Sequence, residues 1–204
     1  MTALPLVRNF VDAQGVEITF YEWPVAEPRA VVQIAHGLGE HAMRYSHVAA
    51  ILNRAGYSVY ADDHRGHGQT GKRMIERAKI RRMGNLGKGG MTATVGQVFE
   101  LTELIQSELP HLPLYLLGHS WGSMLAQKIL NKNSESYAGA VLSGSTLMLP
   151  GIAPTSGFNK KWDKTPNKST KEWLSRDESV GRAFMNDPLC FPETAIEVFG
   201  IANV

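Results

Sequence analysis

One stretch of sequence decides the fold: it runs as Leu112-Pro113-Leu114-Tyr115-Leu116-Leu117, then Gly118-His119-Ser120-Trp121-Gly122, then Met124-Leu125-Ala126-Gln127-Lys128-Ile129-Leu130. The first run is short and continuously apolar, which is typical of a strand buried on both faces of a sheet. In the last run, Leu125 and Ile129 lie one helical turn apart, which indicates a helix. The pattern therefore places Ser120 on a turn between a buried strand and a helix.

The pattern Gly-x-Ser-x-Gly over 118–122 is a modest signal by itself, and its position between strand and helix makes it specific. In that setting the serine sits on a sharp turn, and flanking glycines let neighbouring backbones approach closely. The start of the helix adds backbone N–H groups and the positive end of the helix dipole. We therefore predict that Ser120 is a nucleophile on a turn shaped by Gly118 and Gly122. An ordinary strand-to-helix connection is the alternative.

A second buried strand, Val31–Ala35, runs into the glycine-bracketed loop His36-Gly37-Leu38-Gly39-Glu40-His41. Acyl transfer needs two N–H donors directed at the oxyanion of its tetrahedral intermediate. We expect one donor to be the backbone N–H of Trp121 and the other that of Leu38, with Gly37 in the same loop. Taken alone, this loop is equally compatible with an ordinary strand end. Because a nucleophile is also predicted at Ser120, we favour the oxyanion role for this loop.

A third loop, Asp62-Asp63-His64-Arg65-Gly66-His67-Gly68, follows the apolar strand Tyr57-Ser58-Val59-Tyr60. Its histidines and acids could suggest a metal site. However, the two histidines are three residues apart in a glycine-rich loop, and no third histidine or cysteine is suitably spaced nearby. We favour a loop held by hydrogen bonds of Asp63 and Arg65, close to the site but not catalytic. We expect no metal and no organic cofactor.

These three loops resemble the signatures of the α/β-hydrolase superfamily, in the branch of monoacylglycerol lipases, lysophospholipases and serine-aminopeptidase-like hydrolases. Two later segments, Trp173-Leu174-Ser175-Arg176-Asp177 and Asp187-Pro188-Leu189-Cys190, resemble cap regions of bacterial members. The resemblance implies hydrolysis of a carboxylic ester, of monoacylglycerol or lysophospholipid type, through an acyl-enzyme on Ser120. An aminopeptidase, thioesterase or acyltransferase would use the same serine, because substrate choice depends on the pocket and not on the fold.

The superfamily order is serine, then acid, then histidine, and this chain departs from it. All seven histidines precede Ser120: His36, His41, His47, His64, His67, His111 and His119. The acids Asp163, Asp177 and Asp187 follow the serine, but each resembles a cap residue and not one that follows a late strand. Without a base, a serine hydroxyl is a weak nucleophile near neutral pH.

This departure leaves two interpretations. In the first, which we favour, the chain is a fragment, and the acid and histidine belong to a C-terminal segment outside it. The ending Val198–Val204 carries no helix stop signal, as expected in that case. The strand at Ala138–Gly144 would then be a sheet edge, so we expect self-association or a complementing C-terminal segment. In the second, the chain is complete and weakly active, or a catalytically silent binding protein.

Composition excludes several classes of protein. Of 204 residues, 43% are hydrophobic, and the formal net charge of +2 is too small to argue for nucleic acid. No stretch has the apolar length of a transmembrane helix, and the N-terminus lacks a signal-peptide pattern. The basic cluster at 73–82 indicates a solvated face, with contact to an anionic membrane surface as the alternative. Cys190 is the single cysteine, which fits a cytoplasmic location.

The order of expected elements is a hairpin (Leu6–Val11 and Val16–Trp23), followed by strands that alternate with helices at Arg44–Ala55 and Thr92–Leu109. This order predicts an α/β sandwich with a mostly parallel sheet and flanking helices. The resemblance implies that residues 1–144 form the N-terminal part of an α/β-hydrolase core that lacks its last strands. From Ser145 the composition changes, and the pattern over Trp173–Asp187 predicts a short amphipathic helix. We expect residues 145–204 to form a helical cap, which is truncated if the chain is a fragment. The alternative is a surface insertion without a gating role.

Overall fold

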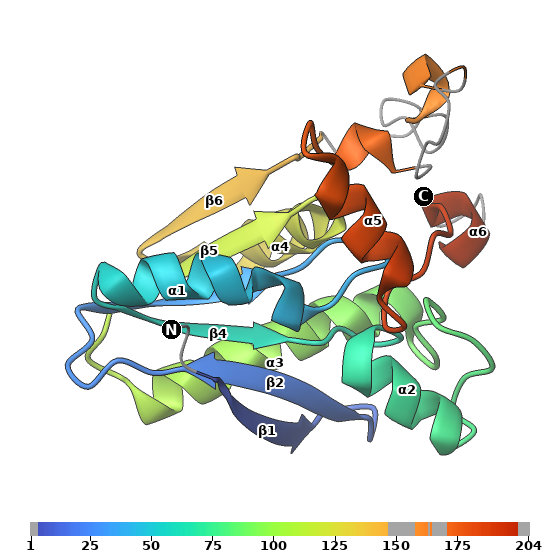
Figure 1. The fold of residues 1–204 in the computed structure, drawn as a ribbon. Coiled ribbons are helices and arrows are strands. Elements are labelled where there is room, and N and C mark those ends of the chain that lie inside the picture. The colour runs from blue at the N-terminus through green and yellow to red at the C-terminus, as the bar shows by residue number, and fades with distance from the viewer. Residues whose placement is uncertain (1–3, 147–157, 163, 165–170, 200–204) are drawn as a thin grey trace.

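A computed structural model describes residues 4–146, 158–162, 164 and 171–199 of the chain (Figure 1). Within these ranges six strands form one sheet in the order β1-β2-β4-β3-β5-β6. β1 (Leu6–Val11) and β2 (Glu17–Trp23) form the expected hairpin, and β2 also runs antiparallel to β4. The remaining strands are mutually parallel: β3 (Ala30–Ala35), β4 (Tyr57–Asp62), β5 (Leu114–His119) and β6 (Gly139–Ser143). The predicted α/β fold with a mostly parallel sheet is confirmed.

Helices cover both faces of the sheet (Figure 1). The helices that connect its strands are η1 (Ala42–Tyr45), α1 (Ser46–Arg54), α2 (Gly68–Glu76), α3 (Gly90–Glu108), α4 (Trp121–Asn133) and η2 (Ser134–Ser136). Successive side chains of β3 point to opposite faces of the sheet, as the two-residue period of a strand requires. Val32 and Ile34 pack with Ala49 of α1, whereas Val31 packs against α3.

Several elements differ from the sequence expectation. β5 begins at Leu114, after Pro113, whose ring nitrogen has no hydrogen to give to a sheet. The helix expected to start at Thr92 begins at Gly90, after Gly89 with a φ of +87°. The helix α2 was not predicted, because its first turn, Gly68-Gln69-Thr70-Gly71, has a low helix propensity.

Beyond β6, the described residues form short helices: η3 (Lys160–Trp162), η4 (Glu172–Leu174), α5 (Glu178–Asn186) and α6 (Ala195–Phe199). The amphipathic stretch Trp173–Asp187 is therefore not one helix. Asp177 stops it, because its carboxylate accepts a hydrogen bond from Ser179 N at 2.9 Å and caps α5. α5 lies near the carboxyl ends of the parallel strands (Figure 1). The Pro- and Gly-broken part of the expected cap, 147–152, lies outside the described residues.

The strand β6 is the last in the sheet, and within the described ranges it pairs only with β5. Its side chains are largely exposed, including Val141 at 58% and Leu142 at 39%. An exposed edge strand with apolar side chains tends to pair with a strand of another chain. The edge that the sequence led us to expect is therefore present in the structure.

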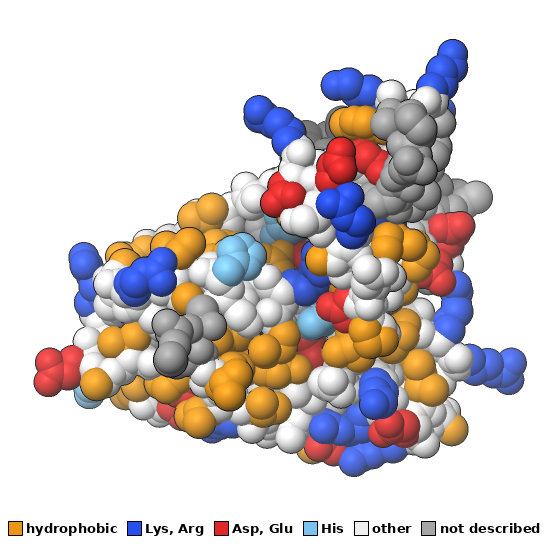
Figure 2. All heavy atoms as spheres, in the orientation of Figure 1, with side chains coloured by type: hydrophobic (Ala, Val, Ile, Leu, Met, Phe, Trp, Pro, Cys, Tyr) orange, Lys and Arg blue, Asp and Glu red, His pale blue; other side chains and the backbone are white. Residues whose placement is uncertain are grey.

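The basic cluster is a solvated face. Arg73 of α2 and Arg77, the residue that follows α2, both form ion pairs with Glu17, at 2.9 and 2.6 Å. Acidic side chains lie among the basic ones in the region of α2 in Figure 2. Among the described helices, none combines the length and the apolar character that crossing a bilayer requires.

Candidate active site

The backbone at Ser120 has an unusual conformation, with a φ of +51° and a ψ of −120°. For a residue with a Cβ, this conformation costs about 1–3 kcal/mol of strain energy. Residues strained in this way cluster at functional sites. Neighbouring backbone holds it there: Ser120 N donates to Ser143 O of β6 at 2.8 Å, and Ser120 O accepts from Ser123 N at 2.9 Å. Ser120 is partly exposed. The sharp turn between strand and helix that the sequence predicts is therefore present.

Glycines let three backbones meet at this turn. A Cβ on Gly118 would lie 2.7 Å from Gly122 O, and one on Gly122 would lie 2.1 Å from Ala35 O. Both distances are shorter than real Cβ contacts, so any side chain would push α4 away from the end of β3. A Cβ on Gly37 would lie 3.3 Å from Ser120 Cβ. The loop after β3 thus contacts the serine directly.

This loop brings Leu38 beside the serine turn. The N–H of Gly37 is already used, because it donates to Glu40 Oε1 at 2.7 Å, and Tyr45 Oη donates to the same oxygen at 2.7 Å. No hydrogen bond within the described residues uses the N–H of Leu38. Trp121 is the first residue of α4, where backbone N–H groups point out of the helix end. The two predicted donors therefore lie on segments that pack against each other.

Neither His119 nor His36 is placed to activate the serine. His119 Nδ1 lies 3.3 Å from Ser143 Oγ, and its ring packs edge-on against Tyr45. His36 Nε2 accepts from His64 N at 3.1 Å, so its Nδ1 carries the hydrogen and donates to Gly37 O at 2.8 Å. Within the described part of the chain, no hydrogen bond joins the Ser120 hydroxyl to a histidine.

The three acids after the serine have other positions. Asp177 caps α5, and Asp163 lies outside the described residues. Asp187, which follows α5, accepts a hydrogen bond from His41 Nε2 at 2.8 Å. The sequence analysis missed this contact, because the two residues are 146 positions apart and no local pattern joins them.

Three buried histidines stack behind the serine turn. The ring centroids of His36 and His64 are 3.9 Å apart, and His67 stacks on Trp121 with centroids 5.0 Å apart. Burial lowers the pKa of His67 to about 3 and holds the pKa of His36 well below its ordinary value. Both rings are therefore neutral near pH 7, and they act as flat, polar packing groups.

These buried rings make stability depend on pH. Unfolded histidines titrate near a pKa of about 6.5, whereas His36 and His67 stay neutral in the fold, so the unfolded chain binds more protons as the pH falls. We expect the free energy of unfolding to drop between about pH 7 and 5, above the main range of carboxyl titration. Denaturant unfolding across this range measures the drop, and His67→Gln should reduce it. Replacing the exposed His111 with asparagine should not. A flat profile would contradict the assignment.

The loop between β4 and α2 is held as expected by Asp63 and Arg65. The Asp63 carboxylate accepts from Ala42 N at 2.9 Å, from Gln69 N at 2.7 Å and from Tyr21 Oη at 3.1 Å. These hydrogen bonds connect the loop to η1, α2 and β2. Because η1 directly follows the loop after β3, Asp63 helps to position both loops.

Arg65 is 1% exposed and ties the same loop to the hairpin turn. Its guanidinium donates to the carboxylate of Asp12, to Leu86 O at 2.9 Å and to Lys88 O at 2.8 Å. Asp12 also accepts from the backbone N–H groups of Gln14 and Val16, at 2.9 and 2.8 Å. One buried ion pair thus joins the turn between β1 and β2 to the loop between β4 and α2.

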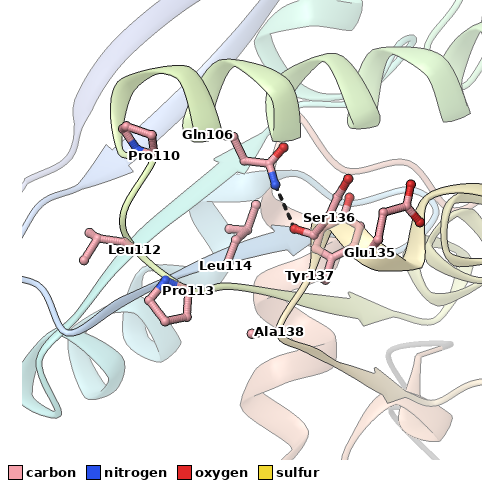
Figure 3. Close-up of a pocket in the computed structure, with 9 residues that line it drawn as sticks. All are labelled: Gln106, Pro110, Leu112, Pro113, Leu114, Glu135, Ser136, Tyr137 and Ala138. Carbon is pink, nitrogen blue, oxygen red and sulfur yellow. Dashed lines mark hydrogen bonds between the residues drawn. The ribbon is translucent and has the colours of Figure 1, made fainter.

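A cavity of about 490 Å³ lies at the other end of the sheet (Figure 3). Residues from the end of α3, the turn before β5 and η2 line it, and Gln106 Nε2 donates to Ser136 O at 2.9 Å across one side. Leu114, at the start of β5, belongs to this lining, whereas Ser120 follows the end of the same strand. Six residues of strand span about 20 Å. This cavity is therefore too far away to hold a substrate of Ser120.

Comparisons with known proteins agree with this architecture. A family model described as serine aminopeptidase, S33, matches residues 26–200. The monoacylglycerol lipase of Mycolicibacterium smegmatis is 32% identical over 191 residues, which cover 89% of this chain and 64% of that protein. The human monoglyceride lipase is 30% identical over 204 residues, covering 95% and 63%. A solved carboxyl esterase from Bacillus coagulans superposes with a TM-score of 0.76 at 26% identity, covering 95% and 68%.

The chain thus spans just under two thirds of the length of these two lipases. The family match covers most of the chain, and the solved esterase shares its sheet and flanking helices over nearly all of it. The chain therefore belongs to the serine aminopeptidase S33 family of α/β-hydrolases.

Proposed function

We propose that this chain carries the nucleophile and the oxyanion site of a carboxylic ester hydrolase. The observation that carries the proposal is the conformation of Ser120, a partly exposed serine held at a φ of +51° between β5 and α4. Such strain persists only where surrounding structure enforces it, and here it presents a hydroxyl at the start of a helix.

In the proposed reaction, Ser120 Oγ attacks the ester carbonyl while its proton passes to the catalytic histidine, and a tetrahedral intermediate forms. The N–H groups of Leu38 and Trp121 then donate to the oxyanion, in a position that they occupy before the substrate arrives. Collapse of the intermediate breaks the ester C–O bond, and the histidine returns the proton to the departing alcohol. Water then hydrolyses the acyl-enzyme to the free acid and Ser120. Gly37, Gly118 and Gly122 serve this geometry by allowing the close approach of the three backbones.

The proposal places the catalytic histidine and acid outside these 204 residues. It is supported by His36, whose two ring nitrogens contact Gly37 O and His64 N, and by His119, whose Nδ1 contacts Ser143 Oγ. A serine site without its base still retains a rate of about 10³–10⁴-fold over water in well-studied proteases, through oxyanion contacts and binding. We therefore expect residues 1–204 alone to be weakly active.

We propose a monoacylglycerol or lysophospholipid as the substrate, with residues 145–204 as a cap over the acyl chain. The relatives named as monoacylglycerol lipases support this choice. So does the position of Phe184 and Phe191, two buried aromatic side chains on either side of the end of α5 that pack against Gly39 and the buried histidines. We also propose that a second copy or a complementing segment covers the edge of β6.

A fluorophosphonate probe tests the function. Residues 1–204 are expressed alone and together with any coding sequence that follows, and both proteins are treated with the probe. Peptide mass spectrometry should find the label on Ser120, faint in the first protein and strong in the second. Initial rates on a monoacylglycerol, an acyl thioester and an aminoacyl anilide then rank the substrate classes, and we expect the glyceride to be fastest. Labelling elsewhere, or none in either protein, would refute the nucleophile.

A further inference from the structure

A group of metal-ligating side chains lies apart from the serine, where the loop after β3 meets the segment after α5. His41, Asp187 and Cys190 each offer one ligand atom, and these atoms all lie within 4.8 Å of one another. The ester chemistry proposed above uses none of the three side chains. The Asp187 carboxylate accepts the hydrogen bond from His41, and the Cys190 thiol contacts the same carboxylate.

The burial of this group is suited to a ligand. His41 is 5% exposed, and its Nδ1 has no hydrogen-bond partner among the described residues. Asp187 keeps 23% of its side chain exposed, and Cys190 is also partly exposed. The group thus has a buried inner ligand and two outer ligands that solvent reaches, which gives an ion a path to enter.

A short turn fixes the two outer ligands. Cys190 N donates to Asp187 O at 3.0 Å, and Leu189 N donates to Asp187 Oδ1 at 3.0 Å. Zinc binds nitrogen and carboxylate oxygen at about 2.0–2.2 Å and sulfur at about 2.3 Å, so tetrahedral ligand atoms lie somewhat closer together than the group found here. Binding would therefore require the three ligand atoms to move closer together. We propose that His41, Asp187 and Cys190 bind one zinc-like divalent ion, with water as the fourth ligand.

The charges of the group match such an ion. A neutral imidazole, a carboxylate and a thiolate together carry two negative charges. The nearest opposing charge is Arg44, which pairs with Glu40 at 3.5 Å while its guanidinium lies over the ring of Phe184. The metal would displace the proton of the Cys190 thiol as the thiolate binds it. The mixed nitrogen, oxygen and sulfur set favours zinc or cobalt over calcium or magnesium.

An ion at this position would fasten the cap to the loop after β3. That junction already contains a backbone hydrogen bond from Phe191 N to Gly39 O at 2.9 Å. The metal site does not depend on the ester hydrolase proposal, because binding is measured without substrate. Its effect on the molecule would be to order 37–41 and 184–191 together.

The test measures metal binding to residues 1–204, prepared reduced and without a histidine tag. Competition with a chromogenic chelator should give one Zn²⁺ per chain, and Co²⁺ should give the charge-transfer absorption of a thiolate–cobalt bond. Cys190→Ser should abolish that absorption and weaken Zn²⁺ binding at least about 10-fold, the loss seen even for outer partners of metal ligands. Asp187→Asn should weaken it similarly.

The matched control is His111→Asn, which removes an exposed histidine far from the group in sequence and should leave affinity unchanged. Circular dichroism checks that each variant folds, and the cobalt spectrum of the unaltered protein needs no variant. Absence of saturable binding, a cobalt spectrum without thiolate absorption, or equal affinity in Cys190→Ser would each overturn the proposal.

Discussion

Replacing Ser120 with alanine should reduce kcat for ester hydrolysis by about 10³-fold or more, measured in whichever form of the protein is active. The substitution removes only the hydroxyl group, and the proposed acyl-enzyme bond forms at the oxygen of that group. Initial rates on a short p-nitrophenyl ester provide the measurement. Ser107→Ala is the matched control, because Ser107 is an exposed serine on α3 whose hydroxyl donates only to Leu104 O within the described residues.

Ser120→Gly should be equally inactive and yet more stable than the original chain. Glycine adopts a φ of +51° without the steric cost of a Cβ, so relief of that strain should add about 1 kcal/mol to the free energy of unfolding. Denaturant unfolding of both variants measures the difference. If Ser120→Ala still turns over the ester, the nucleophile is another group. If Ser120→Gly gains nothing, the strain has been assigned to the wrong residue.

Replacing Asp12 with alanine should destabilise the fold by about 3–5 kcal/mol, because it leaves Arg65 buried without its counter-charge. The Asp12 carboxylate also accepts two backbone N–H groups of the hairpin turn, so the turn loses its internal support. Chemical denaturation measures the loss as a lower midpoint.

The double variant Asp12→Ala with Arg65→Met should recover part of this loss, since the buried charge is then absent. The exposed pair Glu178–Arg182 offers the control, and Glu178→Ala should change stability little. A midpoint for Asp12→Ala close to that of the unaltered chain would show that the Asp12–Arg65 pair does not hold the fold.

Local patterns predicted the parts of the fold that depend on neighbouring residues. The apolar run at 31–35 gave β3, and the alternation after Val16 gave β2, because a buried or half-buried strand leaves a clear period in the sequence. The same holds for the turn at Ser120, whose strand, glycines and helix are contiguous. Its role as nucleophile stays a prediction.

Long-range packing decided the features that the sequence did not reveal. α2 forms although its first turn favours no helix, because Met74 packs against Ile18 of β2 and Thr70 Oγ1 accepts a hydrogen bond from Thr19 N at 2.9 Å. Tertiary packing overrides propensity at such a position. The contact between His41 and Asp187 likewise depends on how the chain returns after 146 residues, which no local period encodes.

The hydrogen bond from Ser120 N to Ser143 O has a wider consequence. It attaches the proposed nucleophile to β6, which is the last strand of the sheet among the described residues and exposes Val141 and Leu142. If the proposed second copy or complementing segment pairs with β6, it would stiffen that strand and, through this single amide, hold Ser120 more firmly. Assembly and reactivity would then be adjusted by the same event.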